Sequence, residues 1–432
     1  MFDINEKPKQ VERALLVGVY KGAEQKEESS SLLAELDSLV DTLDIPVIDR
    51  LLVRVQERNA RYFVGSGKAE EIFERAKQLE IDVIIFDNGL SPAQQRNWEA
   101  LTGMAVIDRE EVILDIFARR ARTKEARLQV DLARMEYSLP RLTRAWGHLS
   151  RQGGGLGGKG EGETQLETDR RLVRAQIDRL KSDLELVRLR RATQRKLRER
   201  LPLPSAAIVG YTNVGKSALL KKLTGAQVLV EDKLFATLDT TTRRVLLPSG
   251  QSLLLTDTVG FIRNLPHRLI EAFKATLEEA VLSDFLIHVL DASHPRVFDF
   301  YQTTMRVLGE LGADTKRMIT VLNKVDLVED ESTLHTLRLH FSDGAFVSVR
   351  TGEGLKELLH RMADLLADRV SKVELALPLD RSDLLSLLHR TSLVIDVVYE
   401  DFHVSVIALV SPKVYARVEP FLVRRDPELQ PA

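Results

Sequence analysis

One octapeptide, GYTNVGKS at residues 210–217, constrains this chain more than any other segment. It satisfies the spacing G-x4-G-K-S, follows an apolar run at residues 206–209 that is typical of a strand, and precedes a helix-like run. In such a unit the glycines let consecutive backbone N–H groups wrap a phosphate, and the dipole of the following helix adds positive potential. Lys216 is expected to reach the β- and γ-phosphates, and Ser217 to bind Mg²⁺. The motif predicts an α/β domain that binds a nucleoside triphosphate, without choosing the base.

A second motif, DTVG at residues 257–260, ends a further apolar run, and its aspartate follows Lys216 by 41 residues. Asp257 is expected to hold Mg²⁺ through water, and the N–H of Gly260 to sense the γ-phosphate. The two motifs together predict a metal-dependent phosphate site.

The choice of base rests on VLNKVD, whose Asn323 follows Asp257 by 66 residues. A carboxylate at Asp326 can accept hydrogen bonds from guanine N1–H and N2–H₂ together, whereas adenine offers no such pair, so an unmatched carboxylate rejects the wrong base. Asn323 is expected to brace the loop and Lys324 to pack along the base, while SVRTGEG at residues 348–354 closes over guanine with backbone N–H groups. All these motifs in order, each at a strand end, predict a GTP-binding domain.

Switch I belongs in LFATLDTTTRR, between the first two motifs. A threonine there must join Mg²⁺ and the γ-phosphate, and we favour Thr237 over Thr240, Thr241 and Thr242, which the residues alone leave open. The expected catalytic set is Lys216, Thr237 and Gly260, and the expected metal ligands are Ser217, Thr237 and Asp257. The expected nucleotide contacts are Gly210, Tyr211, Thr212, Asn213, Val214, Gly215, Lys216, Ser217, Phe235, Ala236, Thr237, Leu238, Asp239, Asp257, Thr258, Val259, Gly260, Asn323, Lys324, Val325, Asp326, Ser348, Val349 and Arg350.

Phe261 stands where many GTPases carry a glutamine that orients the attacking water. Phenylalanine cannot do this, so we expect slow intrinsic hydrolysis that a partner accelerates by ordering the switches. Asn213 raises a second hypothesis, because its carbonyl could help hold K⁺ near the developing charge. Bracing the phosphate loop is an equally good role for it.

Two leucine-rich seams flank a glycine-rich stretch. Leu128, Leu132, Met135, Leu139 and Leu142 have the spacing 4, 3, 4, 3, and so do Val173, Ile177, Leu180, Leu184 and Val187. Seams joined in this way predict an antiparallel helical hairpin over residues 112–200, with its tip at about 151–165. Pro140 and Trp146-Gly147 suggest that the first helix ends or bends before the tip.

The tip carries seven glycines within residues 153–162, and residues 141–200 carry sixteen basic against eight acidic side chains. Glycine permits close backbone approach, and segments that order on contact suit the crevices of folded RNA. We favour a tip that faces nucleic acid over a passive loop.

The sequence on either side of the hairpin predicts further domains. Residues 1–111 alternate strand-like runs, among them RYFVGSG, with helix-like runs, the last of which Ser91-Pro92 is expected to begin as cap and first turn. This alternation predicts an α/β domain with a parallel sheet. Its segment VGSGKAEE lacks two positions of the phosphate-loop motif, so a tight strand-to-helix turn is favoured over a second nucleotide site. Residues 201–371 form the predicted GTPase domain, and residues 372–432 a small α+β domain without a catalytic constellation.

The chain has no cysteine, no signal-like amino terminus and no apolar stretch long enough for a bilayer. We therefore expect a cytoplasmic protein that does not insert stably into membranes, does not bind DNA and is monomeric when free. A peripheral membrane-associated fraction is left open.

GYTNVGKS, FATLD, DTVGFI and NKVD, with GGGLGGKGEGETQLETDRR ahead of them, resemble the HflX family of ribosome-associated GTPases over nearly the whole chain. The resemblance implies that Thr237 in FATLD is the threonine linked to Mg²⁺, and it fits Phe261 at the place of the missing glutamine. Two positions depart from the family pattern. Thr240 replaces a proline, which would loosen switch I, and Val349 replaces an alanine where the backbone does the binding.

The resemblance further implies binding to ribosomal RNA of the large subunit through the hairpin tip, in translation under stress. GTP would hold the binding-competent state, the ribosome would separate into subunits, and stimulated hydrolysis would release the protein. Two alternatives belong to other classes: a regulatory module in which GTP gates docking of protein partners, and an RNA remodeller with an additional ATP site in the amino-terminal domain.

Overall fold

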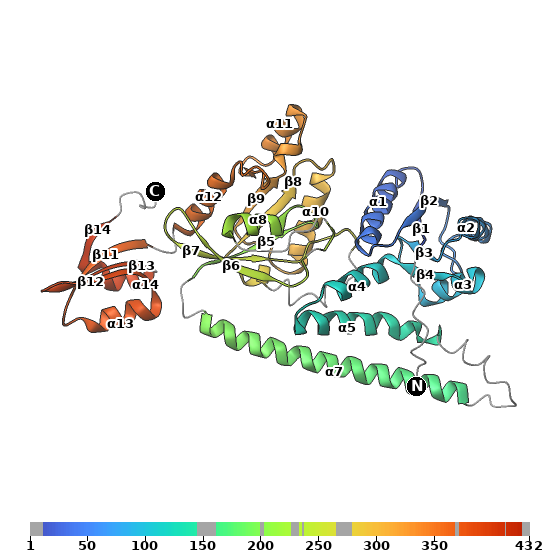
Figure 1. Cartoon of the computed structure of the whole chain (residues 1–432), viewed down its shortest axis with the longest axis horizontal. Coiled ribbons are helices and arrows are strands. Elements are labelled where there is room, and N and C mark those ends of the chain that lie inside the picture. Colours follow the sequence, from blue (N-terminus) through green and yellow to red (C-terminus); the bar gives the residue numbers. More distant parts are fainter. Residues whose placement is uncertain are drawn as a thin grey trace. The chain divides into compact units, whose positions relative to one another are not determined.

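The computed structural model describes residues 12–144, 161–198, 203–225, 233–235, 237–264, 279–367, 371–410 and 412–425. The chain divides into two compact units, whose helices and strands are labelled in Figure 1. The first comprises residues 1–185, 231–239 and 262–273, and the second comprises residues 186–230, 240–261 and 274–432. Two short segments of the GTPase region, on either side of residues 240–261, thus belong to the amino-terminal unit.

The first unit contains a four-stranded parallel sheet in the order β2-β1-β3-β4. Its strands are β1 (Ala14–Lys21), β2 (Val47–Val55), β3 (Val83–Phe86) and β4 (Ala105–Asp108). Its helices are α1 (Lys26–Thr42), α2 (Ser66–Gln78), α3 (Pro92–Thr102) and α4 (Arg109–Arg120). The α3 start is as expected: Ser91 caps it in a reciprocal capping box with Gln94, and Pro92 fills the first turn.

One strand expected from the sequence is absent from this sheet. The stretch RYFVGSG forms only isolated bridges, Asn59 to Phe63 and Tyr62 to Val64, before α2 begins. The tight reversal needs Phe63 at a φ of 68°, a left-handed conformation that a regular strand cannot contain. The prediction was wrong because the apolar residues of this turn are buried in the core under α2 and α3 and so read like a strand.

A helical hairpin completes the first unit. Its arms are α5 (Lys124–Ser138) and α7 (Glu161–Arg198), and a 3-10 turn, η1 (Leu139–Arg144), follows α5 where Pro140 was expected to end it. Eight apolar side chains pack between the arms: Leu128, Leu132, Met135, Leu139, Val173, Ile177, Leu180 and Leu184. The antiparallel seam is thereby confirmed, and Leu142 and Val187 at its expected ends lie outside this cluster. Residues 145–160, which hold most of the predicted tip, lie outside the described residues.

The helical run expected from Val112 onward is interrupted. It divides into α4 and α5, because the chain leaves the helix at Ala121 and Thr123 starts a new one as its N-cap. The Thr123 hydroxyl accepts a hydrogen bond from the N–H of Ala126 at 3.1 Å. The boundary predicted at residue 111 falls within α4.

Four buried charged side chains join four segments of the first unit: α1, the loop after β3, α4 and the segment that begins at residue 262. Arg109 of α4 forms ion pairs with Asp87 at 2.6 Å and with Glu35 of α1. Arg263 donates from Nη2 to the other oxygen of Glu35 at 2.8 Å. All four are nine-tenths or more buried as side chains. The residue that follows Phe261-Ile262 is therefore held by the amino-terminal domain.

The second unit contains a six-stranded sheet in the order β10-β9-β8-β5-β7-β6, in which only β6 is antiparallel. Its strands are β5 (Ser205–Gly210), β6 (Thr241–Leu246), β7 (Ser252–Asp257), β8 (Phe285–Asp291), β9 (Met318–Asn323) and β10 (Ala345–Phe346). Its helices are α8 (Lys216–Thr224), α10 (Val297–Glu310), η2 (Val325–Leu327), α11 (Glu331–His340) and α12 (Leu355–Ala367). This is the predicted α/β domain.

A four-stranded antiparallel sheet in the order β12-β13-β11-β14 ends the chain. Its elements are β11 (Ser371–Pro378), α13 (Ser382–Thr391), β12 (Leu393–Tyr399), β13 (His403–Val410), α14 (Pro412–Val418), η3 (Glu419–Phe421) and β14 (Leu422–Arg425). Its buried side chains form their own cluster, so the expected α+β fold is confirmed. Within the described ranges, none of the helices has the length and apolar character of a membrane span.

The hairpin seam predicts different effects for two leucines of α7. Leu180 is 8% exposed and belongs to the seam, whereas Leu172 is 61% exposed. We expect Leu180→Ala to weaken the arm-to-arm packing by about 2 kcal/mol, and Leu172→Ala to change it by less than about 0.5 kcal/mol. Hydrogen exchange of the α5 amides measures this. Equal protection in the two variants would mean that the arms do not pack through Leu180.

Candidate nucleotide-binding site

The phosphate loop connects β5 to α8 in the second unit. A Cβ at Gly210 would lie 2.3 Å from the carbonyl oxygen of Val289 on β8, so only glycine lets the strand end this close to its neighbour. Gly215 has a φ of 95°, outside the usual range of other residues, and starts α8. Asn213 also has positive φ, at 60°, and its side chain is exposed. The potassium hypothesis for Asn213 stays a prediction.

Lys216 begins α8 and is buried. Its ammonium donates to the carbonyl oxygens of Tyr211 at 2.6 Å and Gly210 at 3.2 Å, so the charge lies under the loop. Burial lowers the pKa of Lys216 to about 8, against a smaller opposing effect of Asp257. Lys216 is thus a cation whose charge is costly until an anion approaches.

The expected metal ligands Ser217 and Asp257 come together. The Ser217 hydroxyl donates to Oδ2 of Asp257 at 2.6 Å, and Asp257 is fully buried at the end of β7. Two hard oxygen donors, one at the start of α8 and one at the end of β7, fit Mg²⁺, which in nucleotide sites takes few protein ligands besides phosphate oxygens and water. Among the described residues, no cluster of three or more His, Asp or Glu side chains offers a different metal site.

The D-x-x-G segment lies directly against the phosphate loop. Phe261 N–H donates to the Gly210 carbonyl at 3.1 Å, and Thr212 N–H donates to the Phe261 carbonyl at 2.8 Å. A Cβ at Gly260 would lie 2.9 Å from Lys216 Nζ, so the backbone of this glycine passes close to the ammonium. Because the Phe261 side chain is only 1% exposed and has no polar group, it cannot orient a water molecule.

Asn323 at the end of β9 links the phosphate side to the base side. Its Nδ2 donates to the Val214 carbonyl at 2.8 Å, and its Oδ1 accepts from the N–H of Val349 at 3.1 Å. Lys324 has a φ of 63° and forms an ion pair with Asp291 at 2.6 Å. Asp291 was not among the predicted site residues, although it ends the apolar strand β8 as Asp257 ends β7.

Asp326 carries the expected base-selecting carboxylate. A hydrogen bond from the Ser348 side chain, with the guanidinium of Arg350 at 2.6 Å, holds the pKa of Asp326 below its usual value. The carboxylate therefore stays ionised at neutral pH and acts only as an acceptor. This is the form that guanine recognition requires.

Most of the expected site residues thus gather at the carboxyl ends of the parallel strands of one sheet. They are residues 210–217, 257–260, 323–326 and 348–350, joined by the contacts given above. Phe235, Thr237, Leu238 and Asp239 belong instead to the first unit, and Ala236 lies outside the described residues. A further contact that sequence reasoning missed is the Tyr211 ring, which stacks on Phe300 of α10 with centroids 4.0 Å apart.

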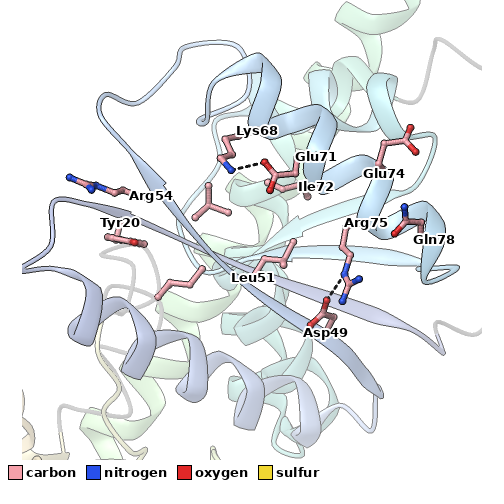
Figure 2. A pocket seen from close by; sticks show the side chains of 12 residues that line it. Tyr20, Asp49, Leu51, Arg54, Lys68, Glu71, Ile72, Glu74, Arg75 and Gln78 are labelled. Carbon is pink, nitrogen blue, oxygen red and sulfur yellow. Dashed lines mark hydrogen bonds and ion pairs between the residues drawn. The ribbon is translucent and has the colours of Figure 1, made fainter.

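A pocket of about 720 Å³ lies beside α2 in the first unit (Figure 2). Two ion pairs line it, Lys68 with Glu71 at 2.5 Å and Arg75 with Asp49 at 2.8 Å. Mixed charge of this kind does not favour a polyanion. Helix α2 begins after Gly65, and the turn before it follows the isolated bridges of residues 59–64 and not the expected strand. The additional ATP site stays a prediction.

Three family descriptions match successive parts of the chain. "GTP-binding GTPase N-terminal" matches residues 30–118, "GTP-binding GTPase Middle Region" residues 120–198, and "50S ribosome-binding GTPase" residues 205–324.

Curated relatives match over nearly full length. GTPase HflX of Akkermansia muciniphila is 52% identical over 98% of this chain and 100% of its own, and GTPase HflX of Escherichia coli K12 is 40% identical over 85% and 86%. Among solved structures, a GTP-binding protein from Sulfolobus solfataricus in complex with GDP is 25% identical over 82% of this chain and 98% of its own, with a TM-score of 0.43.

The base-side geometry predicts a change of specificity. In Asp326→Asn one acceptor oxygen becomes an amide donor that faces the guanine amino group. We expect GTP affinity to fall about 100-fold or more, while xanthosine triphosphate, with a carbonyl in place of that amino group, gains affinity. Competition binding with both nucleotides measures this. A variant that keeps wild-type preference for GTP would remove Asp326 from base recognition.

The pKa of Lys216 predicts proton uptake on nucleotide binding. Phosphates beside the ammonium raise its pKa, so the side chain is mostly neutral before binding at about pH 9 and charged afterwards. We expect close to one proton taken up per GTP at about pH 9 and almost none at about pH 7. Calorimetry in buffers of different ionisation enthalpy measures the number. Equal uptake at both pH values would contradict the lowered pKa.

Proposed function

Because this chain belongs to the HflX family of GTPases, and therefore binds and hydrolyses GTP, we propose that it acts on the ribosome. In this proposal it binds the large subunit in the GTP state and separates stalled or idle ribosomes into subunits. Hydrolysis stimulated by the ribosome then releases it. We propose that the protein acts in the cytoplasm under conditions of translational stress.

The packed hairpin is the observation that carries the proposal. Helix α7 has 38 residues, which corresponds to a rod of about 57 Å. Leucines of α5 and α7 hold the two arms together, so the arms form one packed support. On α7, Arg171, Arg174 and Arg179 are exposed and suit a phosphate backbone. A linker between domains would need no such paired support.

The match of residues 205–324 to the family described as "50S ribosome-binding GTPase" supports the same partner. We propose that the glycine-rich segment enters ribosomal RNA, since glycine allows close approach and the neighbouring Arg151 and Lys159 supply charge.

For the chemistry, we propose that backbone N–H groups of residues 210–217 bind the phosphates and that the Lys216 ammonium turns from the loop carbonyls to the β- and γ-phosphates. Ser217, Asp257 and Thr237 would hold Mg²⁺, which supplies neutralisation of phosphate charge when bound. The Gly260 N–H donates to the γ-phosphate, and the ionised Asp326 accepts from guanine.

The side chain of Phe261 cannot position water, so intrinsic hydrolysis is slow in this proposal. The ribosome accelerates it by ordering the segments on either side of residues 240–261. Phe261 itself contributes by its backbone hydrogen bonds to Gly210 and Thr212, which keep the D-x-x-G segment beside the phosphate loop.

A sedimentation series with purified ribosomes tests the proposal. With a non-hydrolysable GTP analogue we expect subunits to separate and the protein to stay on the large subunit, in a salt-sensitive manner. With GDP we expect intact ribosomes. A variant that lacks residues 153–162 should bind GTP as the wild type does but leave ribosomes intact. This result would show that GTP binding alone does not separate ribosomes.

Two outcomes would count against this function. If ribosomes separate into subunits equally with GDP and with the analogue, the bound nucleotide does not control the separation. If the variant that lacks residues 153–162 still separates ribosomes, the tip is not required. This result would favour a GTP-gated module that docks through another surface.

A further inference from the structure

Residues 233–239 of the switch I segment contact other residues of the first unit. Phe235 is 2% exposed, and its ring packs edge-on against Phe117 of α4 with centroids 4.7 Å apart. Lys233 forms an exposed ion pair with Asp44 at 2.8 Å. These contacts fix the beginning of the segment. Its end is fixed by a different residue, Asp239.

Asp239 binds the start of the first hairpin arm. Its Oδ2 accepts hydrogen bonds from the backbone N–H groups of Arg122 at 2.9 Å and Thr123 at 3.1 Å, and its Oδ1 accepts from the Thr123 hydroxyl at 2.5 Å. Thr123 is the N-cap of α5. The carboxylate therefore lies at the positive end of the α5 dipole, with three donors around it.

This arrangement does not suit the nucleotide contact that the sequence suggested for Asp239. A carboxylate repels the phosphates of GTP, and it cannot leave three donors at α5 without cost. Its sequence neighbour Thr237, two residues earlier, is the residue expected to join Mg²⁺ and the γ-phosphate. A fixed Asp239 therefore restricts where Thr237 can go.

We propose that Asp239 is a positioning residue that couples the hairpin to GTP hydrolysis. This inference rests on the proposed function, because it takes the large ribosomal subunit as the partner of the tip. Helix α5 extends about 22 Å from Thr123 towards the tip. When the large subunit binds the tip, it restricts the movement of α5. The hydrogen bonds from Arg122 and Thr123 to Asp239 then restrict Thr237 to one position. The partner thereby accelerates hydrolysis without contributing a side chain to the site.

The test compares GTP turnover with and without large ribosomal subunits in Thr123→Val and Thr123→Ser. Valine has the shape of threonine but cannot donate to Asp239, whereas serine keeps the hydroxyl. We expect Thr123→Val to lose about tenfold or more of the stimulated kcat, with unstimulated turnover and the KM for GTP within about twofold of wild type. Thr123→Ser should retain the stimulation.

Asp239→Asn separates the coupling from helix capping, since it leaves the Thr123 cap intact. It should reduce the stimulated kcat to a similar extent, and the double variant should be no worse than the worse single variant, because both act on one contact. Lys233→Ala is the matched control, because it breaks an exposed ion pair of the same segment that does not involve α5. It should be stimulated like the wild type.

Hydrogen exchange of residues 122–127 supplies a readout that does not depend on activity. Faster exchange in Asp239→Asn is expected, and unchanged exchange would mean that the contact does not form. If the wild type is stimulated and Thr123→Val is stimulated equally, the coupling is refuted and the ribosomal function stands. If large subunits do not stimulate the wild type, the ribosomal function itself fails.

Discussion

The side-chain amide of Asn323 joins the two loops that a guanine nucleotide must contact at once. Its nitrogen holds the Val214 carbonyl of the phosphate loop, and its oxygen holds the N–H of Val349 in the base loop. The amide is so close that a Cβ at Gly215 would lie 2.4 Å from Nδ2, which explains the glycine better than loop flexibility does. The predicted phosphate loop and base loop are therefore joined through one side chain at the ends of the sheet strands.

The segments that must respond to the nucleotide are attached differently. Residues 257–261 bind back onto the phosphate loop through Phe261, whereas Phe235 and Asp239 contact helices of the amino-terminal unit. Residues 233–239 thus make these contacts within the first unit, whereas residues 257–261 belong to the second unit.

The sequence predicted those elements and motifs that depend on residues close together in the chain. The G-x4-G-K-S, D-x-x-G and N-K-x-D motifs follow β5, β7 and β9 as expected, and the 4, 3, 4, 3 leucine spacing identified the hairpin seam. Local signals also misled, since the buried turn around Phe63 resembled a strand.

Contacts between distant residues left no such signal. Asp239 lies 116 residues after Thr123, and Arg263 lies 228 after Glu35. Nothing in the polar stretch LDTTTRR distinguishes a carboxylate that binds a helix start from one that is solvated. The break between α4 and α5 was missed for a different reason: Thr123 is an ordinary N-cap residue and gave a local signal that was overlooked.

The buried cluster of Arg109, Arg263, Glu35 and Asp87 has an evolutionary consequence. Its two positive and two negative charges balance only while all four side chains are present. Loss of one leaves an uncompensated charge in the interior, at a cost of about 3–5 kcal/mol, whereas joint replacement by apolar residues of similar volume costs little. We therefore expect relatives either to keep all four residues or to have exchanged all four together, which would link changes in the amino-terminal domain to changes in the segment after Phe261.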